Sequence, residues 1–256
     1  MREETVLYRR DESVGIITFN RPHRLNAMNG ELLDDFIKQL IEAREDEEAV
    51  TVIMTGAGRS FCAGEDLKET SAGKTFEQWV SEADRLQDIQ RLILRLNKPL
   101  IAAVHGYALG GGLEFALSAD IRIAAQDAKF GFPETSVGLT ITQAGTKLIS
   151  QVVGLGKAKE LVFTGEFIDA DEAFRIGLVN KVVRNQSLMD EALRMGKKIG
   201  ERSPLSLRLS RIALDQGLHS SFEQVLEIEA NHLLICGGTE KQKEFVERKL
   251  AEMKQG

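Results

Sequence analysis

The stretch of this sequence that most restricts the fold lies between residues 99 and 134. It begins with the apolar run 99–105 (PLIAAVH), whose length and composition are typical of a buried strand. Three consecutive glycines, at 110–112, follow shortly afterwards, and the next residues, LEFALSA, have the composition of a short helix. We therefore expect a strand, a glycine turn and a helix. Glycine has no Cβ, so such a turn lets another molecule approach the backbone closely.

The predicted helix would direct its first N–H groups at whatever occupies the glycine turn. These groups have no partner inside a helix and lie at the positive end of its dipole, so the turn is a candidate oxyanion hole. Glu114 falls in the first turn of the helix, where the dipole favours its ionised form. Glu134 follows Pro133 in a later loop. Two carboxylates beside an anion site could work as an acid/base pair.

The same features also have an ordinary structural interpretation. A glycine-rich turn between a strand and a helix is more often a plain connection than an active site. Most glutamates are solvated surface residues. The pattern alone leaves both interpretations open.

Composition and charge argue against several classes of protein. Of the 256 residues, 43% are hydrophobic and 28% charged, as in ordinary soluble globular proteins. The net charge of -6 argues against binding to nucleic acid or to anionic membranes. The N-terminal residues MREETVLYRR lack the apolar core of a signal peptide, and no run approaches the roughly 20 apolar residues of a membrane span. We expect a cytoplasmic protein.

The residues that commonly bind metals are few and scattered. Cys62 and Cys236 lie far apart in segments of different character, which predicts neither a disulfide nor a zinc site. The four histidines show no metal-ligand spacing, so we predict no metal. His105 and both cysteines are interpreted as packing residues.

Hydrophobic periodicity and capping signals predict alternating strands and helices. Residues 5–9 and 14–19 should form an opening hairpin. Asn29 should cap a helix over 31–46, and the capping-box pair Thr75 and Gln78 should begin a helix that ends near residue 96. The other expected strands are 50–55, 99–105, 121–125, 129–132 and 178–183, and the other expected helices are 143–153, 157–163, 169–175, 205–216, 222–235 and 241–253.

This order of elements indicates an α/β layer with mainly parallel strands. From residue 142 onward helices dominate, and Ser203 followed by Pro204 is a helix start signal. We therefore predict a core domain over residues 1–202 and a helical region over residues 203–256. The helical region would suit either oligomer contacts or a lid, or it is simply a helical subdomain.

Four segments of the sequence contain recognisable motifs. They are NRPHRLNAMN at 20–29, FCAGEDLKE at 61–69, HGYALGGGLEFALSADIRIAAQDAKFGFPE at 105–134 and VVGLGKAKELVFTGEFIDADEAFRIGLVNKVV at 152–183. In this order, the four segments resemble the enoyl-CoA hydratase/isomerase superfamily, the crotonases. The resemblance implies an α/β fold of repeated β-β-α units winding into a spiral, followed by a C-terminal helical trimerisation region. It also implies acyl-CoA thioester substrates, no cofactor beyond the CoA of the substrate, and a homotrimer or homohexamer.

The resemblance also implies roles for particular residues. The backbone N–H groups of Glu65 and Gly111 would form the oxyanion hole, and the side chain at position 65 would matter little. Glu114 would act as base toward a water that attacks C3 of a trans-2-enoyl thioester, and Glu134 would supply a proton at C2. The remaining positions that resemble CoA or substrate contacts are Arg24, Ala27, Ala63, Asp66, Leu67 and Gly110.

Two departures from the family pattern and several alternatives remain. Residues 141–146 read ITQAGT where hydratases usually have a Pro-Gly-x-Gly-Gly-Thr run, and the segment TEKQKEFVERK near the C-terminus is shorter than usual. An isomerase that moves a double bond from C3 to C2 needs one base, so two glutamates favour hydration. A non-catalytic CoA-binding or RNA-binding relative is the other alternative. Trp79 could contact an acyl chain or serve in packing.

Overall fold

The computed structural model of this protein describes residues 4–254, which fall into two units. The first unit ends at Lys197 and the second begins at Lys198. The domain division at residues 202 and 203 stays a prediction. Within the described residues, no helix combines the length and the apolar character needed to cross a membrane.

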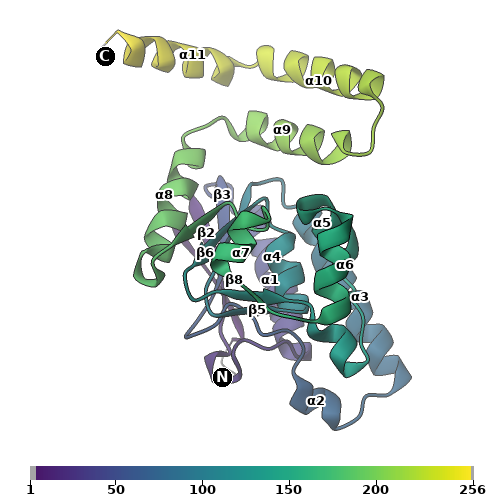
Figure 1. The fold of residues 1–256 in the computed structure, drawn as a ribbon. Coiled ribbons are helices and arrows are strands. Elements are labelled where there is room, and N and C mark those ends of the chain that lie inside the picture. Colours follow the sequence, from purple (N-terminus) through teal and green to yellow (C-terminus); the bar gives the residue numbers. More distant parts are fainter. Residues whose placement is uncertain (1–3, 255–256) are drawn as a thin grey trace. The chain divides into compact units, whose positions relative to one another are not determined.

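The described residues of the first unit contain a six-stranded sheet with the strand order β1-β2-β3-β4-β6-β9 (Figure 1). β1 and β2 form the predicted antiparallel hairpin, and every other neighbouring pair is parallel. This arrangement confirms the α/β layer with mainly parallel strands. The strands are β1 (Val6–Asp11), β2 (Val14–Phe19), β3 (Thr51–Gly56), β4 (Leu100–Val104), β6 (Ile121–Ala125) and β9 (Lys181–Val183).

The described residues also form a three-stranded sheet, and it shows that the chain enters the glycine turn by a different path from the one we predicted. Its order is β5 (Tyr107–Leu109), β7 (Lys129–Gly131) and β8 (Ile168–Asp169). The run 99–105 forms β4 in the large sheet, but β5, which we did not predict, leads into the turn. β5 and β8 are too short to show a strand period, and pairing with distant residues of β7 defines them.

Most predicted helices of the first unit are present. Asn29 caps α1 with its side-chain oxygen, and Thr75 and Gln78 form the predicted capping box of α3. Two helices, α2 and α8, were not predicted. The helices are α1 (Gly30–Glu45), α2 (Leu67–Ser71), α3 (Phe76–Leu94), α4 (Gly111–Leu117), α5 (Gly145–Val153), α6 (Leu155–Thr164), α7 (Ala170–Arg175) and α8 (Leu188–Gly200), with short 3-10 turns at Pro22–Arg24, Pro133–Val137 and Asn185–Ser187.

Two element boundaries differ from the prediction for local reasons. The helix expected from residue 143 begins at Gly145, because Ala144 has a left-handed backbone with φ 62° and the Gln143 N–H donates to Glu114 instead. The strand expected from residue 178 begins at Lys181. The N–H groups of Leu178 and Val179 donate to the Ala173 carbonyl and so finish the turn after α7.

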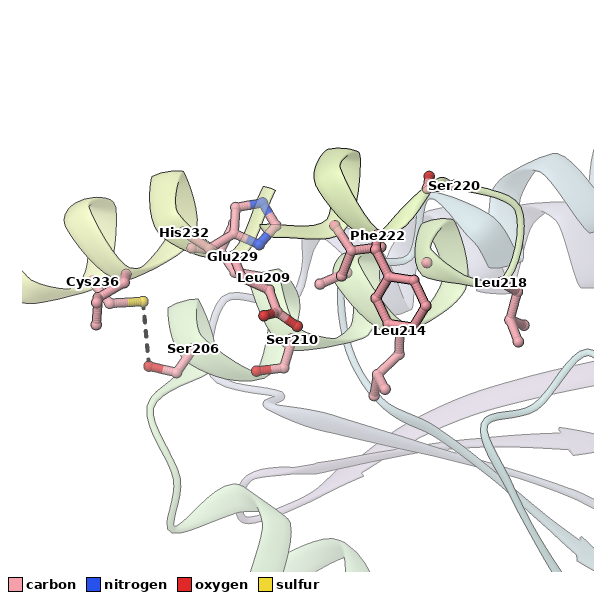
Figure 2. Close-up of a pocket in the computed structure, with 14 residues that line it drawn as sticks. Ser206, Leu209, Ser210, Leu214, Leu218, Ser220, Phe222, Glu229, His232 and Cys236 are labelled. Atoms are coloured by element: carbon pink, nitrogen blue, oxygen red, sulfur yellow. Dashed lines mark hydrogen bonds between the residues drawn. The ribbon is translucent and has the colours of Figure 1, made fainter. Parts of the chain in front are cut away.

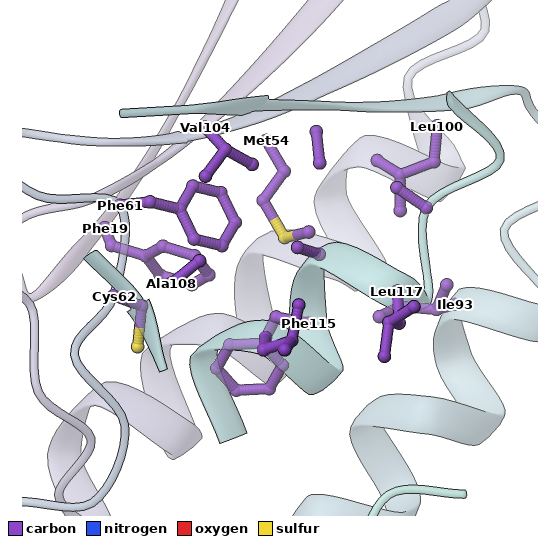
Figure 3. Packing of buried hydrophobic residues seen from close by; sticks show 14 of the residues in the cluster. Phe19, Met54, Phe61, Cys62, Ile93, Leu100, Val104, Ala108, Phe115 and Leu117 are labelled. Carbon is purple, nitrogen blue, oxygen red and sulfur yellow. The ribbon is translucent and has the colours of Figure 1, made fainter. Parts of the chain in front are cut away.

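A cluster of phenylalanine rings fixes α4 within the core (Figure 3). The Phe115 ring of α4 stacks on Phe19 of β2 with centroids 5.4 Å apart, and it meets Phe36 of α1 edge-on at 5.0 Å. Phe61 lies edge-on to Phe19. Full burial of one such side chain contributes about 1.5–3 kcal/mol. This packing holds the start of α4, and with it the glycine turn, in a fixed place.

The second unit is helical in its described part. Ser203 caps α9 and Pro204 is its first residue, as the sequence predicted. A capping box of Ser221 and Gln224 begins α10. Within the described residues of α9, α10 and α11, no side chain is buried. The helices are α9 (Pro204–Gly217), α10 (Phe222–Gly237) and α11 (Glu240–Met253).

Candidate active site

Two segments that are distant in sequence run side by side at the glycine turn. The Cys62 N–H donates to the Tyr107 carbonyl at 2.9 Å, and the Leu109 N–H donates to the Cys62 carbonyl at 3.1 Å. Next along, Gly64 has φ +87°, and a Cβ on it would lie 2.6 Å from the Leu109 carbonyl oxygen, so only glycine fits there. This contact brings the two predicted oxyanion positions, one on each segment, to the same cavity.

The amides of Glu65 and Gly111 are available to a ligand. Among the residues that the structure describes, neither N–H group donates to a protein acceptor. Their neighbours are engaged: the Gly110 N–H donates to the Gly131 carbonyl at 2.9 Å, and the Asp66 N–H donates to the Met28 carbonyl at 2.9 Å. The backbone is therefore held on both sides while these two donors remain able to bind an anionic oxygen.

The Glu114 carboxylate is buried and held by backbone N–H groups. Its Oε1 accepts from Gln143 at 2.6 Å, from Thr142 at 3.2 Å and from Gly145 at 3.3 Å. Burial raises its pKa, although these donors act in the opposite direction. From the helix dipole we expected the ionised form of Glu114 to be favoured, which means a lowered pKa. That prediction is wrong, because burial raises the pKa more than the backbone donors lower it.

The segment that departs from the family pattern supplies these donors. Thr142, Gln143 and Gly145 all lie in the stretch 141–146, so the loss of a proline and two glycines still leaves backbone amides directed at Glu114. A Cβ on Gly145 would lie 2.6 Å from Glu114 Oε1. The chain therefore needs glycine at this position for the carboxylate to stay where it is.

Glu134 lies in the 3-10 turn after Pro133 and differs from Glu114 in its environment. Burial raises the pKa of its carboxyl to about 7, and the negative charge of Glu114 acts in the same direction. Its Oε2 atom is buried without a hydrogen-bond partner among the described residues. Its Oε1 atom would lie 3.0 Å from a Cβ on Gly110, which places the carboxyl beside the glycine turn.

Most of the predicted site residues line one cavity of about 490 Å³. They are Glu65, Gly111, Glu114, Glu134, Ala63, Leu67 and Gly110. The other three do not line it. Arg24 is exposed in the first 3-10 turn. Arg21 ties Ala27 and Asp66 together by donating to the Ala27 carbonyl and pairing with the Asp66 carboxylate.

Trp79, which the sequence left open between acyl contact and packing, lines the cavity. The sequence prediction missed several other lining residues, among them Glu82 and Leu86 from the same face of α3. Successive spacings of three and four residues from Trp79 along α3 were the available signal. The lining also includes Met28, Leu109, Val137, Leu139, Thr142 and Phe167. Among the described residues, no group of three or more His, Cys, Asp or Glu side chains could hold a metal ion.

Comparison with known protein families decides the family of this chain. The family model described as enoyl-CoA hydratase/isomerase matches residues 9–255. This chain belongs to the enoyl-CoA hydratase/isomerase family. Its relatives in this family include a short-chain-enoyl-CoA hydratase of Clostridium acetobutylicum, 41% identical over 98% of both chains. They also include a crotonyl-CoA hydratase of Syntrophomonas wolfei, 40% identical over 98% of both chains.

Solved structures of enoyl-CoA hydratases have the same fold. The enzyme of Bacillus anthracis matches with a TM-score of 0.93 and 32% identity, over 97% of this chain and 96% of that one. The enzyme of Mycobacterium smegmatis matches with a TM-score of 0.90 and 31% identity, over 98% and 97%. These similarities confirm the predicted family and the crotonase-like α/β fold with a helical C-terminal region.

Proposed function

We propose that this protein is an enoyl-CoA hydratase that adds water across the 2,3 double bond of a trans-2-enoyl-CoA thioester. The observation that carries the proposal is that one cavity contains Glu114, Glu134 and two backbone amides that have no protein acceptor in the described part of the chain. Addition at C3 places negative charge on the thioester oxygen. The amides of Glu65 and Gly111 would stabilise that charge without rearranging, and a lost donor costs on the order of 3 kcal/mol in the barrier.

The two glutamates would divide the proton transfers. Glu114, held by three backbone donors, would accept a proton from the attacking water, because those donors stabilise its carboxylate. Glu134, with a pKa of about 7, is protonated in a large fraction of molecules at neutral pH and would donate a proton to C2. The reaction needs no cofactor beyond the CoA of the substrate.

The substrate is proposed to carry a short acyl group. Two relatives at 40–41% identity are named for short-chain enoyl-CoA and for crotonyl-CoA. The charged side chains of Glu65 and Glu82 in the cavity wall also suit a short acyl group better than a long apolar one. Arg24, Ala27 and Asp66 stay predicted contacts of the CoA portion, and a cytoplasmic location stays part of the proposal.

The second unit is proposed to join copies of this chain into a homotrimer or homohexamer. Figure 2 shows a groove between α9 and α10 lined by Leu209, Leu214, Leu218 and Phe222. Phe222 is 91% exposed and Leu214 is 75% exposed. Exposed apolar side chains gathered in one groove are a common sign of a protein–protein contact.

The test is a panel of enoyl-CoA thioesters monitored by their ultraviolet absorbance. Hydration of crotonyl-CoA should remove the absorbance of the conjugated double bond. Glu114→Gln and Glu134→Gln should each lower kcat about a hundredfold or more while the thioester still binds. A gain of conjugated absorbance from 3-enoyl thioesters would instead assign the isomerase reaction. Thioester binding without turnover of any panel member would identify a non-catalytic relative.

A further inference from the structure

The side chain of Glu65 is held at the edge of the cavity by two neighbours. Its Oε1 atom accepts from Lys74 Nζ at 2.5 Å and from Thr70 Oγ1 at 2.5 Å. Lys74 also pairs with Glu82 of α3, and its ammonium lies 4.6 Å from the centre of the Trp79 ring. One lysine thus ties together three residues of the cavity wall, Glu65, Trp79 and Glu82.

This cluster is well shielded from water. The exposed fractions of the side chains are 9% for Lys74, 15% for Glu65 and 13% for Glu82. Burial acts to lower the pKa of Lys74, but the bonds to both carboxylates act against it, and the net pKa is raised. The lysine therefore stays charged at neutral pH, and its ion pairs are screened less than pairs on the surface.

The hydrogen bonds from Lys74 and Thr70 hold the side chain of Glu65, and the backbone N–H of Glu65 is proposed to bind the thioester oxygen. The backbone is fixed on both sides of this residue, because the Met28 N–H donates to the Gly64 carbonyl at 2.7 Å and the Asp66 N–H donates to the Met28 carbonyl at 2.9 Å. The Gly64 carbonyl and the Glu65 N–H belong to one planar peptide unit, so the first of these bonds sets the line along which the N–H points. The two hydrogen bonds to the Glu65 side chain add a third anchor to the same residue.

We propose that Lys74 is a positioning residue that, together with the two backbone bonds, keeps the Glu65 N–H directed into the oxyanion hole by holding the Glu65 carboxylate. The inference rests on the proposed hydratase function. It also departs from the expectation that the side chain at position 65 matters little. Oxyanion donors stabilise charge only when their direction is fixed, and an error of about 1 Å in an active site can cost about a hundredfold in rate.

The experiment compares crotonyl-CoA hydration by Lys74→Met, Lys74→Arg and Lys68→Met. Lys68 is an exposed lysine of α2 and is the matched control. Lys74→Met should lower kcat about tenfold to a hundredfold with KM changed less than about threefold. The reason is that the Lys74–Glu65 ion pair would position a donor that binds the transition state more strongly than the substrate. Lys74→Arg keeps the charge and should recover part of the loss. Lys68→Met should match the parent enzyme.

A double variant separates the lost tie from charge repulsion. Without Lys74, the carboxylates of Glu65 and Glu82 would repel each other, and that repulsion alone could move Glu65. Lys74→Met combined with Glu82→Leu removes the repulsion and supplies no hydrogen-bond donor to the Glu65 carboxylate, so kcat should stay low. A return to parental kcat in the double variant would overturn the proposal.

The absorbance of a bound chromophore measures how strongly the oxyanion hole polarises a carbonyl, and it needs no turnover. An aryl-substituted enoyl-CoA absorbs at longer wavelength when its carbonyl is polarised by hydrogen-bond donors. Lys74→Met should bind it with parental affinity but shift its absorbance less. If the parent enzyme hydrates crotonyl-CoA but Lys74→Met keeps its kcat and its spectral shift, the positioning role is wrong. If the parent enzyme lacks hydratase activity, the proposed function fails, and the spectral shift still tests the tie.

Discussion

Glu114 and Glu134 line one cavity, but their surroundings differ in what they offer a carboxylate. Glu114 has three backbone donors, whereas Glu134 Oε2 is buried with no partner among the described residues. A carboxylate with donors is a better place for negative charge than one without. The difference supports the proposed roles, in which Glu114 is the base and Glu134 is the acid.

The acid role of Glu134 predicts how the rate depends on pH. Its raised pKa of about 7 means that the protonated form is present below that pH and is lost above it. We therefore expect kcat/KM for crotonyl-CoA to fall as pH rises through about 7, toward a tenfold loss per pH unit. Initial rates between pH 6 and 9 at constant ionic strength measure this. A flat or rising profile would contradict the assignment.

The pH dependence of thermal unfolding tests the raised pKa of Glu134 independently of the reaction rate. Because the folded-state pKa of Glu134 lies above the ordinary value of 4.5, protonation favours the folded state. This contribution to the free energy of unfolding is complete below pH 4.5 and disappears as pH rises through about 7. The difference in Tm between Glu134→Gln and the parent should therefore grow in favour of the variant over this range.

At the scale of elements, the segment over 141–146 and the start of α4 together position the Glu114 carboxylate. α4 is fixed in the core by Phe115, and it presents Glu114 to amides of that segment. The first residue of α5, Gly145, packs directly against the carboxylate. The position of Glu114 therefore depends on both helices, α4 and α5.

Substitution of Gly145 tests this dependence. In Gly145→Ala, the new Cβ would lie 2.6 Å from Glu114 Oε1 and 2.7 Å from Ile141 Cγ2, so the carboxylate must move. We expect kcat to fall about tenfold to a hundredfold. Gly156→Ala in α6 is the control, because a Cβ there meets nothing within 4 Å. Steady-state kinetics of both variants, with Tm measured alongside, give the answer. Equal kcat in the two would refute the dependence.

The same elements explain what the sequence could and could not predict. The caps at Asn29 and Thr75 are local signals, and the structure has both. Among the predicted residues that line the cavity, Gly110, Gly111, Glu114 and Glu134 followed from the glycine turn and the two carboxylates, whereas Ala63, Glu65 and Leu67 followed from motif position. By contrast, β5 exists because it pairs with β7, and the Glu65–Lys74 ion pair joins two loop residues on either side of α2. Such contacts leave no periodic pattern in the chain.

The pKa of Glu114 was predicted wrongly for a related reason. Its place in the first turn of α4 is visible in the sequence, and the dipole argument follows from it. Its burial depends on Phe115, on the loop over 141–146 and on the rest of the core, which no local pattern reports. Burial then decides the direction of the shift.

At the scale of the whole molecule, the described residues of the second unit lack a core of their own. In that part, the side chains of α9, α10 and α11 are all at least partly exposed, including Leu233 at 71% and Leu234 at 74%. Helices gain most of their stability from burying an apolar face. A second copy of this chain, with the same apolar surface, is the partner that the proposed oligomer supplies.

This argument predicts that apolar side chains of α10 hold the oligomer together. Phe222→Ser combined with Leu233→Ser should convert most of the assembly to monomer at micromolar concentration, since two such side chains contribute about 3–6 kcal/mol when buried. Lys241→Ser, an exposed change in α11, is the matched control and should keep the parental mass. Light scattering after size-exclusion chromatography measures the mass. A double variant that keeps the parental mass would show that this face of α10 does not join the copies.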